Sequence, residues 1–206
     1  MPFLRSGGLN GVTLPILQSR IPKPEDLAVL RIPVLEAIVG IGKALKGAAS
    51  VWAIGGDAAE VMLGVNVPAD HVAILTSKEG CDEARLRLGD YLFPGPALSE
   101  EQLERRAIFD SQPYPIHVRG SYARFDIGGI DVRAWGGLQV KVGDWEWGDP
   151  LEFKPDVVRV VGTSIPVVPL RFMSDLYFGL GWIDRAEKIA QAVARSHHTT
   201  GGPAWR

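Results

Sequence analysis

The stretch VWAIGGDAAEVMLGVNVPADHVAIL, residues 51–75, decides the fold class of this chain. Its first apolar run ends at Gly55-Gly56, a pattern typical of a buried strand that stops at a turn. The following DAAEVML predicts a short helix, and HVAILT, after a loop, predicts a second buried strand. A strand, a turn, a helix and a second strand in so short a stretch indicate a protein that mixes both element types.

The segment before this stretch changes from irregular to helical. Residues 1–23 contain Gly and Pro without a regular period, so we expect a poorly ordered lead-in. A helical pattern begins at Pro24, and Pro33 starts a second helix, since proline is tolerated in the first helical turn. The second helix has one apolar stripe, which we interpret as core packing: Val34, Leu35, Ile38, Ile41 and Leu45.

The segment after this stretch is first helical and then extended. Residues 77–92 predict a helix, and Ser99 suits the N-cap of another. From residue 116 the period becomes two, and Gly128-Gly129 joins two strand-like runs as a hairpin turn. Further strands are predicted at residues 138–142, 157–162 and 165–170, and closing helices at 171–182 and 184–196.

This order of elements predicts an α/β (α+β) fold, a small mixed β-sheet flanked by helices. We expect one domain over residues 24–196 and a flexible tail over residues 197–206.

The composition is typical of an ordinary globular protein. Of the 206 residues, 46% are hydrophobic and 22% are charged. The formal net charge of −2 disfavours general nucleic-acid binding, which needs clustered Lys and Arg. Cys81 is the single cysteine, so an intrachain disulfide is excluded. Neither a signal-peptide pattern nor an apolar run of membrane-spanning length is visible, so we expect a cytoplasmic protein. The scarcity of Asn favours a thermophilic source.

The glycine turn and two later carboxylates are the candidate site. A turn between a strand and a helix exposes backbone N–H groups where phosphate oxygens bind, although glycine pairs also end strands for packing reasons. Asp70 precedes the second strand, where it suits either a metal-ligand role or a cap. Asp131 lies on a later strand, as a metal ligand or an exposed strand residue.

These residues resemble the nucleotidyltransferase superfamily with the polymerase-β-type fold. That family runs strand, Gly-Gly or Gly-Ser, helix, then a strand with an Asp-x-Asp or Asp-x-Glu pair, and a third carboxylate on a later strand. The segments GG, ADHVAIL and GIDVRAW carry the resemblance here. In addition, IPVVPLRFMSDLYFGLGWIDRAEKI, residues 165–189, resembles a segment of the abortive-infection and toxin-type branch.

The resemblance implies a nucleotide site at Gly55, Gly56 and Asp57 and a metal site at Asp70 and Asp131. In active members the acids hold two Mg²⁺ ions, one of which activates the attacking hydroxyl while the other binds the triphosphate. The implied ligand is therefore a nucleoside triphosphate, with Mg²⁺ as cofactor only if the protein is active.

The chain departs from the family pattern at several of these positions. Val72 stands two residues after Asp70, where the second carboxylate is expected, and its side chain offers no oxygen to Mg²⁺. Asp57 follows the glycine turn and would either repel a phosphate or stabilise the start of the helix. Gly181 and Ile183 stand where basic residues are expected.

Three basic residues near the chain end suit phosphate contacts or, as we favour, solvated surface charges: Arg171, Arg185 and Lys188. We favour the hypothesis of a degenerate relative that serves as a binding or regulatory module. The alternative is an active, Mg²⁺-dependent nucleotidyltransferase that moves NMP from an NTP to a hydroxyl acceptor. A third interpretation is a scaffold that binds a protein partner or a second copy through Trp145 and Trp147, unless these rings cover the edge of the core.

Overall fold

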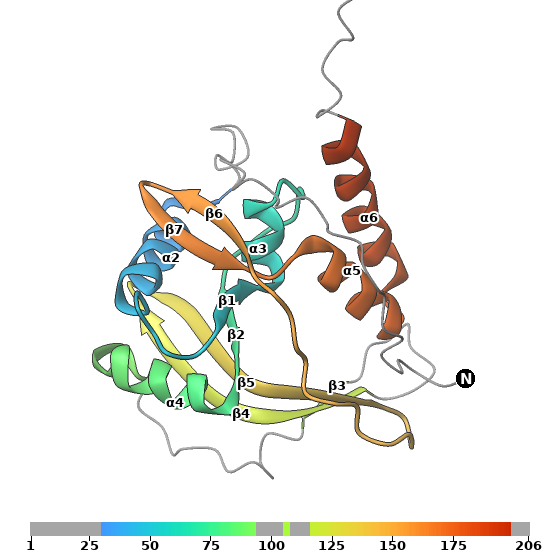
Figure 1. Ribbon diagram of the computed structural model, residues 1–206, viewed down its shortest axis with the longest axis horizontal. Helices are drawn as coiled ribbons and strands as arrows, with labels where there is room; N and C mark the ends of the chain where they lie inside the picture. The colour runs from blue at the N-terminus through green and yellow to red at the C-terminus, as the bar shows by residue number, and fades with distance from the viewer. Residues whose placement is uncertain (1–29, 94–104, 108–115, 199–206) are drawn as a thin grey trace, which may run out of the picture.

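A mixed β-sheet organises the chain in the computed structural model, which describes residues 30–93, 105–107 and 116–198 (Figure 1). Its described strands lie in the order β3-β4-β5-β2-β1-β7-β6. The strands are β1 (Trp52–Gly55), β2 (Val72–Thr76), β3 (Arg105–Ala107), β4 (Ile116–Ile127), β5 (Ile130–Val142), β6 (Asp156–Val160) and β7 (Thr163–Val167). The described helices are α2 (Ile32–Ala44), α3 (Gly56–Met62), α4 (Lys78–Arg87), α5 (Leu170–Gly179) and α6 (Ile183–His198), with a 3₁₀ turn η1 (Gly89–Tyr91).

The strand pairing is both parallel and antiparallel. The central strands β1 and β2 are antiparallel, while β2 pairs with β5 and β1 with β7 in parallel. The outer pairs, β4 with β5 and β6 with β7, are antiparallel hairpins. The predicted fold class, a mixed sheet flanked by helices, is therefore confirmed.

The two faces of the sheet differ in what covers them. One face, called here the helix-covered face, packs against α2 and α4 and carries buried side chains of β1, β2 and β5: Ile54, Val72, Ile74, Val132 and Ala134. Because side chains alternate along a strand, the opposite face carries the remaining residues of β2, β5 and β4. This open face comprises Ala73, Tyr122, Arg124, Asp131, Arg133 and Trp135, all of them exposed or half-buried.

Glycine lets α4 approach the sheet closely. A β-carbon at Gly80 would lie 1.9 Å from Thr76 Oγ1, and one at Gly136 would lie 2.5 Å from the Ser77 carbonyl oxygen. Both distances are far below van der Waals contact, so a larger residue at either position would push the helix away. The N-terminus of α4 is capped by Ser77, whose hydroxyl accepts a hydrogen bond from Gly80 N–H at 3.1 Å.

Most predicted elements form, with two differences. The helix started by Pro33 is α2, and the Gly128-Gly129 hairpin is the β4–β5 turn. Residues 138–142 do not form a separate strand, because β5 continues past an irregularity opposite Gly120. The expected helix after Ser99 is wrong in its described part, since Arg105–Ala107 is strand β3 and pairs with β4. The helix predicted from Pro24, the 1–23 lead-in and residues 199–206 lie outside the described residues.

The closing helices α5 and α6 form a hairpin beside α3, on the side of the sheet opposite α2 and α4 (Figure 1). Gly181, with φ of +75°, supplies the left-handed backbone at the turn between the two helices. Helix α6 runs to His198, two residues into the predicted tail. Within the described residues, no helix has the length and apolarity that crossing a bilayer requires.

Candidate functional site

The glycine turn lies where β1 passes directly into α3. Gly56 has φ of +60°, a left-handed conformation that favours glycine. A β-carbon at Gly55 would lie 3.2 Å from the side chain of Leu75, so packing also restricts that position. The turn thus lies between strand and helix, as predicted. Backbone conformation accounts for glycine at position 56, and packing accounts for glycine at position 55.

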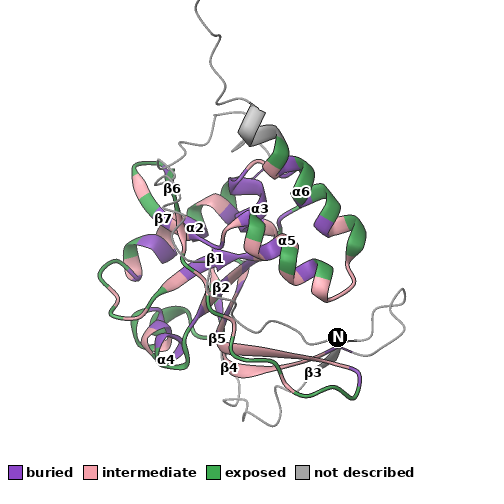
Figure 2. Cartoon of the chain, turned by 45° about the vertical axis from the view of Figure 1, so that its right-hand side comes forward, coloured by how far each residue is buried: buried purple, intermediate pink, exposed green. Residues whose placement is uncertain are grey.

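A buried charge network begins at the next residue. Asp57 Oδ1 accepts a hydrogen bond from Nη2 of Arg185, which comes from α6. Arg185 also donates to Glu60 Oε1, from Nη2 at 2.8 Å and from Nε at 3.2 Å. Tyr177 of α5 donates its hydroxyl to the same Glu60 oxygen at 3.0 Å. Figure 2 shows that α3, which carries both acids, is largely buried.

This network perturbs its members. Burial would lower the pKa of Arg185, but hydrogen bonds to Glu60 and Asp57 outweigh it, so the pKa lies above its ordinary value. Burial, and then the charge of Glu60, raise the pKa of Tyr177. The Glu60 side chain is fully buried, and its Oε2 accepts no hydrogen bond from the part of the chain that the structure describes. Arg185 is therefore no solvated surface charge, contrary to the sequence-based interpretation, because two carboxylates and a tyrosine ring enclose it.

Asp70 lies in the loop just before β2, and its side chain is 76% exposed. Its Oδ1 lies 2.9 Å from His71 Nδ1, and this hydrogen bond lowers the pKa of Asp70. Among the described residues, His71 is the only side chain that hydrogen-bonds the Asp70 carboxylate. Its exposure and local hydrogen bond match the cap-like alternative at least as well as a ligand role.

Asp131 lies on the open face and is held between two arginines. Its Oδ1 accepts a hydrogen bond from Arg124 Nε at 2.7 Å, and its Oδ2 accepts one from Arg133 Nε at 2.8 Å and forms an ion pair with Arg133 Nη2 at 2.6 Å. Burial would raise the pKa of Asp131, but the hydrogen bonds from the two arginines outweigh it and hold the pKa below its ordinary value. The carboxylate is therefore ionised at neutral pH, and each of its oxygens already has an arginine partner.

Val72 occupies the wrong face to share a metal with Asp131. Val72 pairs in register with Val132, and both side chains are fully buried on the helix-covered face. The β2 position on the same side as Asp131 is Ala73, which pairs with Arg133, and by alternation His71. The expectation that Val72 marks the second ligand position is thus wrong, because a one-residue step along a strand changes the face.

The residues present do not fit a two-magnesium centre at Asp70 and Asp131. Mg²⁺ takes oxygen ligands in near-octahedral geometry, but both Asp131 oxygens already accept arginine N–H groups. Ala73, beside Asp131 on the open face, offers no ligand atom. Across the described ranges, no three His, Cys, Asp or Glu side chains come together as a metal-binding group.

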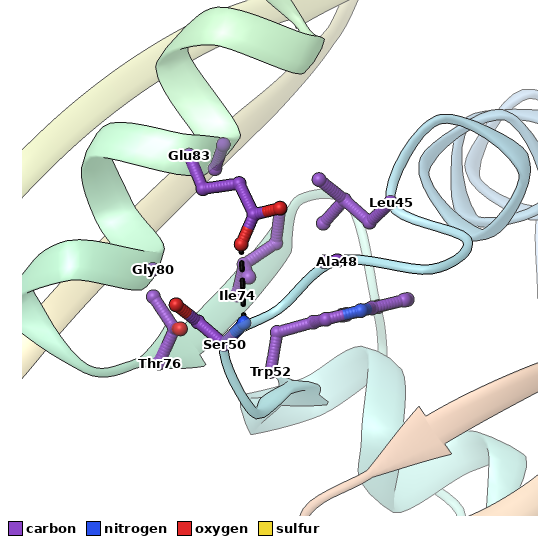
Figure 3. Close-up of a pocket in the computed structure, with 9 residues that line it drawn as sticks. Leu45, Ala48, Ser50, Trp52, Ile74, Thr76, Gly80 and Glu83 are labelled. Atoms are coloured by element: carbon purple, nitrogen blue, oxygen red, sulfur yellow. Dashed lines mark hydrogen bonds between the residues drawn. The ribbon is translucent and has the colours of Figure 1, made fainter.

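A small pocket lies elsewhere, between α2, α4 and β2 (Figure 3). Its interior leaves no room even for a water molecule, so it is a packing gap and not a ligand cavity. Its carboxylate, Glu83, accepts hydrogen bonds from Ala49 N–H and Ser50 N–H, both at 3.1 Å. The pocket is on the helix-covered face, away from the glycine turn, so it belongs to the packing of the helices on the sheet.

Cys81 is a buried thiol on the same face of the sheet. Burial raises its pKa to about 11, which leaves the thiol protonated at neutral pH.

The two tryptophans of the acidic turn do not form one exposed patch. Trp147 is covered by the Arg119 guanidinium, 4.3 Å from its ring centroid, and by Lys141 at 5.9 Å. Trp145 is 58% exposed. Trp145 is thus exposed while Trp147 lies beneath two cations, and the alternatives of a partner surface and of a cover for the core edge both stay predictions.

Sequence reasoning missed four residues of these networks: Glu60, Tyr177, Arg124 and Arg133. Glu60 is an acid within the apolar run AAEVM, a signal that marks a buried and paired charge. Arg124 and Arg133 are equally far from the Gly128-Gly129 turn, so counting outward along the hairpin pairs them with each other and places Asp131 on the same face, diagonal to Arg124.

No protein-family model matches the chain, and no curated protein matches it. Among solved structures, the fold is similar to that of TM1012, a putative nucleotidyltransferase from Thermotoga maritima, with a TM-score of 0.56 and 22% sequence identity, covering 78% of this chain and 92% of that one. A crystal structure of ANT(2″)-Ia in complex with adenylyl-2″-tobramycin gives a TM-score of 0.43 at 13% identity over 77% of this chain and 88% of that one. A solution structure of the antibiotic-resistance factor ANT(2″)-Ia gives 0.40 at 14% identity over 80% and 92%. The chain thus shares the fold of TM1012, which agrees with the resemblance seen in the sequence, and at this identity the likeness establishes the fold alone.

Proposed function

We propose that this protein is a binding or regulatory module built on a nucleotidyltransferase fold, and that it does not transfer nucleotides. The observation that carries this proposal is the state of Asp131, whose two oxygens accept hydrogen bonds from Arg124 and Arg133. Two guanidinium groups stand where an active site of this type needs cation-binding oxygens. Each arginine also repels a divalent ion by charge.

The β2 strand supports the same proposal. On the side that Asp131 faces, β2 offers the methyl group of Ala73 where a metal site needs a second carboxylate. His71 is adjacent, but imidazole suits softer metals than Mg²⁺. An active, Mg²⁺-dependent transferase is the alternative, and it would require Asp131 to exchange both arginines for metal ions.

The candidate ligand is a nucleoside triphosphate at Gly55, Gly56 and Asp57. The pairing of Asp57 with Arg185, which is shared with Glu60, reduces the repulsion that a bare carboxylate would exert on a phosphate at this turn. Binding without turnover is the behaviour expected of such a module.

Two assays on the full-length chain test the proposal. Isothermal titration with ATP, GTP, CTP and UTP, with and without Mg²⁺, measures binding. Incubation with α-labelled nucleotides and mixed acceptors measures NMP transfer and pyrophosphate release. We expect binding without release. Pyrophosphate release that disappears in Asp131→Asn would overturn the proposal in favour of the active enzyme.

A further inference from the structure

Four residues in one row connect the glycine turn to the arginine pair. Gly55 of β1 is in register with Ala73 of β2, Ala73 with Arg133 of β5, and Arg133 with Arg124 of β4. Neighbouring strands lie about 4.8 Å apart, so the turn and the arginines lie within reach of one nucleotide-sized ligand. Ala73, between them, carries only a methyl group on this face.

Asp131 fixes the two arginines but does not engage all of their N–H donors. Asp131 binds Nε of Arg124 and both Nε and Nη2 of Arg133. The Arg124 guanidinium also lies 4.5 Å from the ring centroid of Phe93. Their side chains remain 45% and 41% exposed. A guanidinium has five N–H donors, and within the described residues neither Nη of Arg124 nor Nη1 of Arg133 donates a hydrogen bond. Fixed cations with donors to spare are preorganised for an anion.

The charges around the two arginines balance. Arg124, Arg133 and Asp131 sum to +1, and Asp126, which lies across the hairpin from Asp131 and acts on Arg124 by charge, brings the local sum to zero. Asp126, the next acid on β4, turns its Oδ1 to Gly129 N–H at 2.7 Å, which places that oxygen at the hairpin turn. On the other side of Arg133 along the open face, Tyr122 and Trp135 form a ring pair with centroids 4.6 Å apart. An aromatic surface beside cations suits a phosphorylated ligand with a planar base.

We infer that Arg124 and Arg133 form a metal-independent site for the phosphates of a nucleoside triphosphate, in which the arginines replace divalent ions as the cationic groups of the open face. The inference rests on the proposed function and gives its ligand a position. Arginine binds phosphate oxygens through paired N–H groups and needs no metal. The bound phosphates would lie over Ala73, between the arginines and the Gly55–Gly56 turn.

The test is titration of the full-length protein with ATP, and separately with inorganic tripolyphosphate, in buffer with either Mg²⁺ or EDTA. We expect ATP to bind in EDTA at least as tightly as in Mg²⁺, because free triphosphate carries more negative charge. Binding of ATP but not tripolyphosphate means that the base adds affinity; equal binding of both means that the phosphates suffice. Either result supports the site, whereas ATP binding that requires Mg²⁺, or no binding of either ligand, overturns it.

Three variants locate the site. Arg133→Gln should weaken ATP binding at least about tenfold, the size of a charge-assisted pair of hydrogen bonds. Arg159→Gln, at an exposed position on edge strand β6, is the matched control and should leave binding within about twofold. Asp131→Asn releases the arginines from the carboxylate that fixes them but keeps both cations, so its loss of affinity should be clearly smaller than that of Arg133→Gln. A loss in Asp131→Asn equal to that in Arg133→Gln would show that the cluster only maintains the strand, and would overturn the inference. NMP transfer tests the proposed function separately.

Discussion

At Asp131 the two carboxylate oxygens are shared between Arg124, at the diagonal position on the neighbouring strand, and Arg133, two residues along the same strand. Such a carboxylate is stabilised in its ionised form by hydrogen bonds and by charge. The same contacts reduce its capacity to bind a cation, because fewer lone pairs remain. Protonation of Asp131 and folding are therefore linked.

This linkage predicts a pH dependence of stability. The pKa of Asp131 is lowered from 3.8 in the folded protein, so its stabilising contribution is complete above the unfolded value and is lost as pH falls through the lower folded value. The urea midpoint of the wild type should exceed that of Asp131→Asn at neutral pH. The difference should shrink as pH falls below 3.8. A difference independent of pH would contradict the ion pairing.

At the scale of the elements, β2 shows what a sequence pattern predicts and what it leaves undetermined. HVAILT predicts the strand because it is an apolar run between turn signals. The same apolarity on both sides hides which residues face the helices, and Val72 and Ala73 are equally suited to either face on sequence alone. Only pairing with Val132 and Arg133 of β5 fixes the orientation.

Substitution by aspartate at these two neighbours tests the orientation. Val72→Asp would bury a charge without a partner and should cost more than about 4 kcal/mol or prevent folding. Ala73→Asp places a carboxylate opposite Arg133 on the open face and should change stability by less than about 1 kcal/mol. Urea unfolding followed by circular dichroism measures both. Equal destabilisation by the two substitutions would reverse the assignment of the faces.

Two helical glycines give a matched test of how α4 packs. A β-carbon at Gly80 would meet Thr76 Oγ1, which itself donates a hydrogen bond to the Val51 carbonyl at 2.7 Å, whereas nothing lies within 4 Å at Gly40 of α2. Alanine gains about 0.5–1 kcal/mol over glycine within a helix. We therefore expect Gly40→Ala to stabilise the protein by that amount, and Gly80→Ala to destabilise it by about 1–3 kcal/mol through overpacking. The free energies of unfolding in urea decide this, and stabilisation by both substitutions would show that α4 can shift without cost.

The predictions from sequence succeeded where contacts are local. The apolar stripe of α2 and the Gly128-Gly129 hairpin depend on residues a few positions apart, so their periods are visible in the chain. The Glu60–Arg185 contact joins residues 125 positions apart and has no local pattern. For that reason Arg185 was interpreted as a surface charge. The nucleotide and metal roles of Gly55, Gly56, Asp57, Asp70 and Asp131 stay predictions, to be decided by binding measurements.

At the scale of the whole molecule, one buried carboxylate connects the sheet to the C-terminal hairpin. Glu60 lies in α3, which continues directly from β1, and its Oε1 binds Tyr177 of α5 and Arg185 of α6. The apolar contacts of α5 and α6 bury surface and stabilise the hairpin. The charge network fixes the orientation of the hairpin, because a buried charge tolerates few arrangements of its donors. Because Asp57 shares Arg185 with Glu60, the position of the hairpin is tied to the residue that follows the glycine turn.

Removing the arginine should therefore loosen the hairpin before the sheet. Arg185→Gln leaves Glu60 buried with Tyr177 as its remaining donor, and breaking a buried pair in this way costs about 3–5 kcal/mol. We expect hydrogen exchange to accelerate strongly at amides of α5 and α6 while β1, β2 and β5 keep their protection, because local opening requires less free energy than global unfolding. Arg171→Gln, at an exposed position of the same hairpin, is the control and should exchange like the wild type. Equal acceleration in the sheet would mean that the hairpin and sheet unfold as one unit, and unchanged exchange in Arg185→Gln would mean that apolar packing alone holds the hairpin against α3.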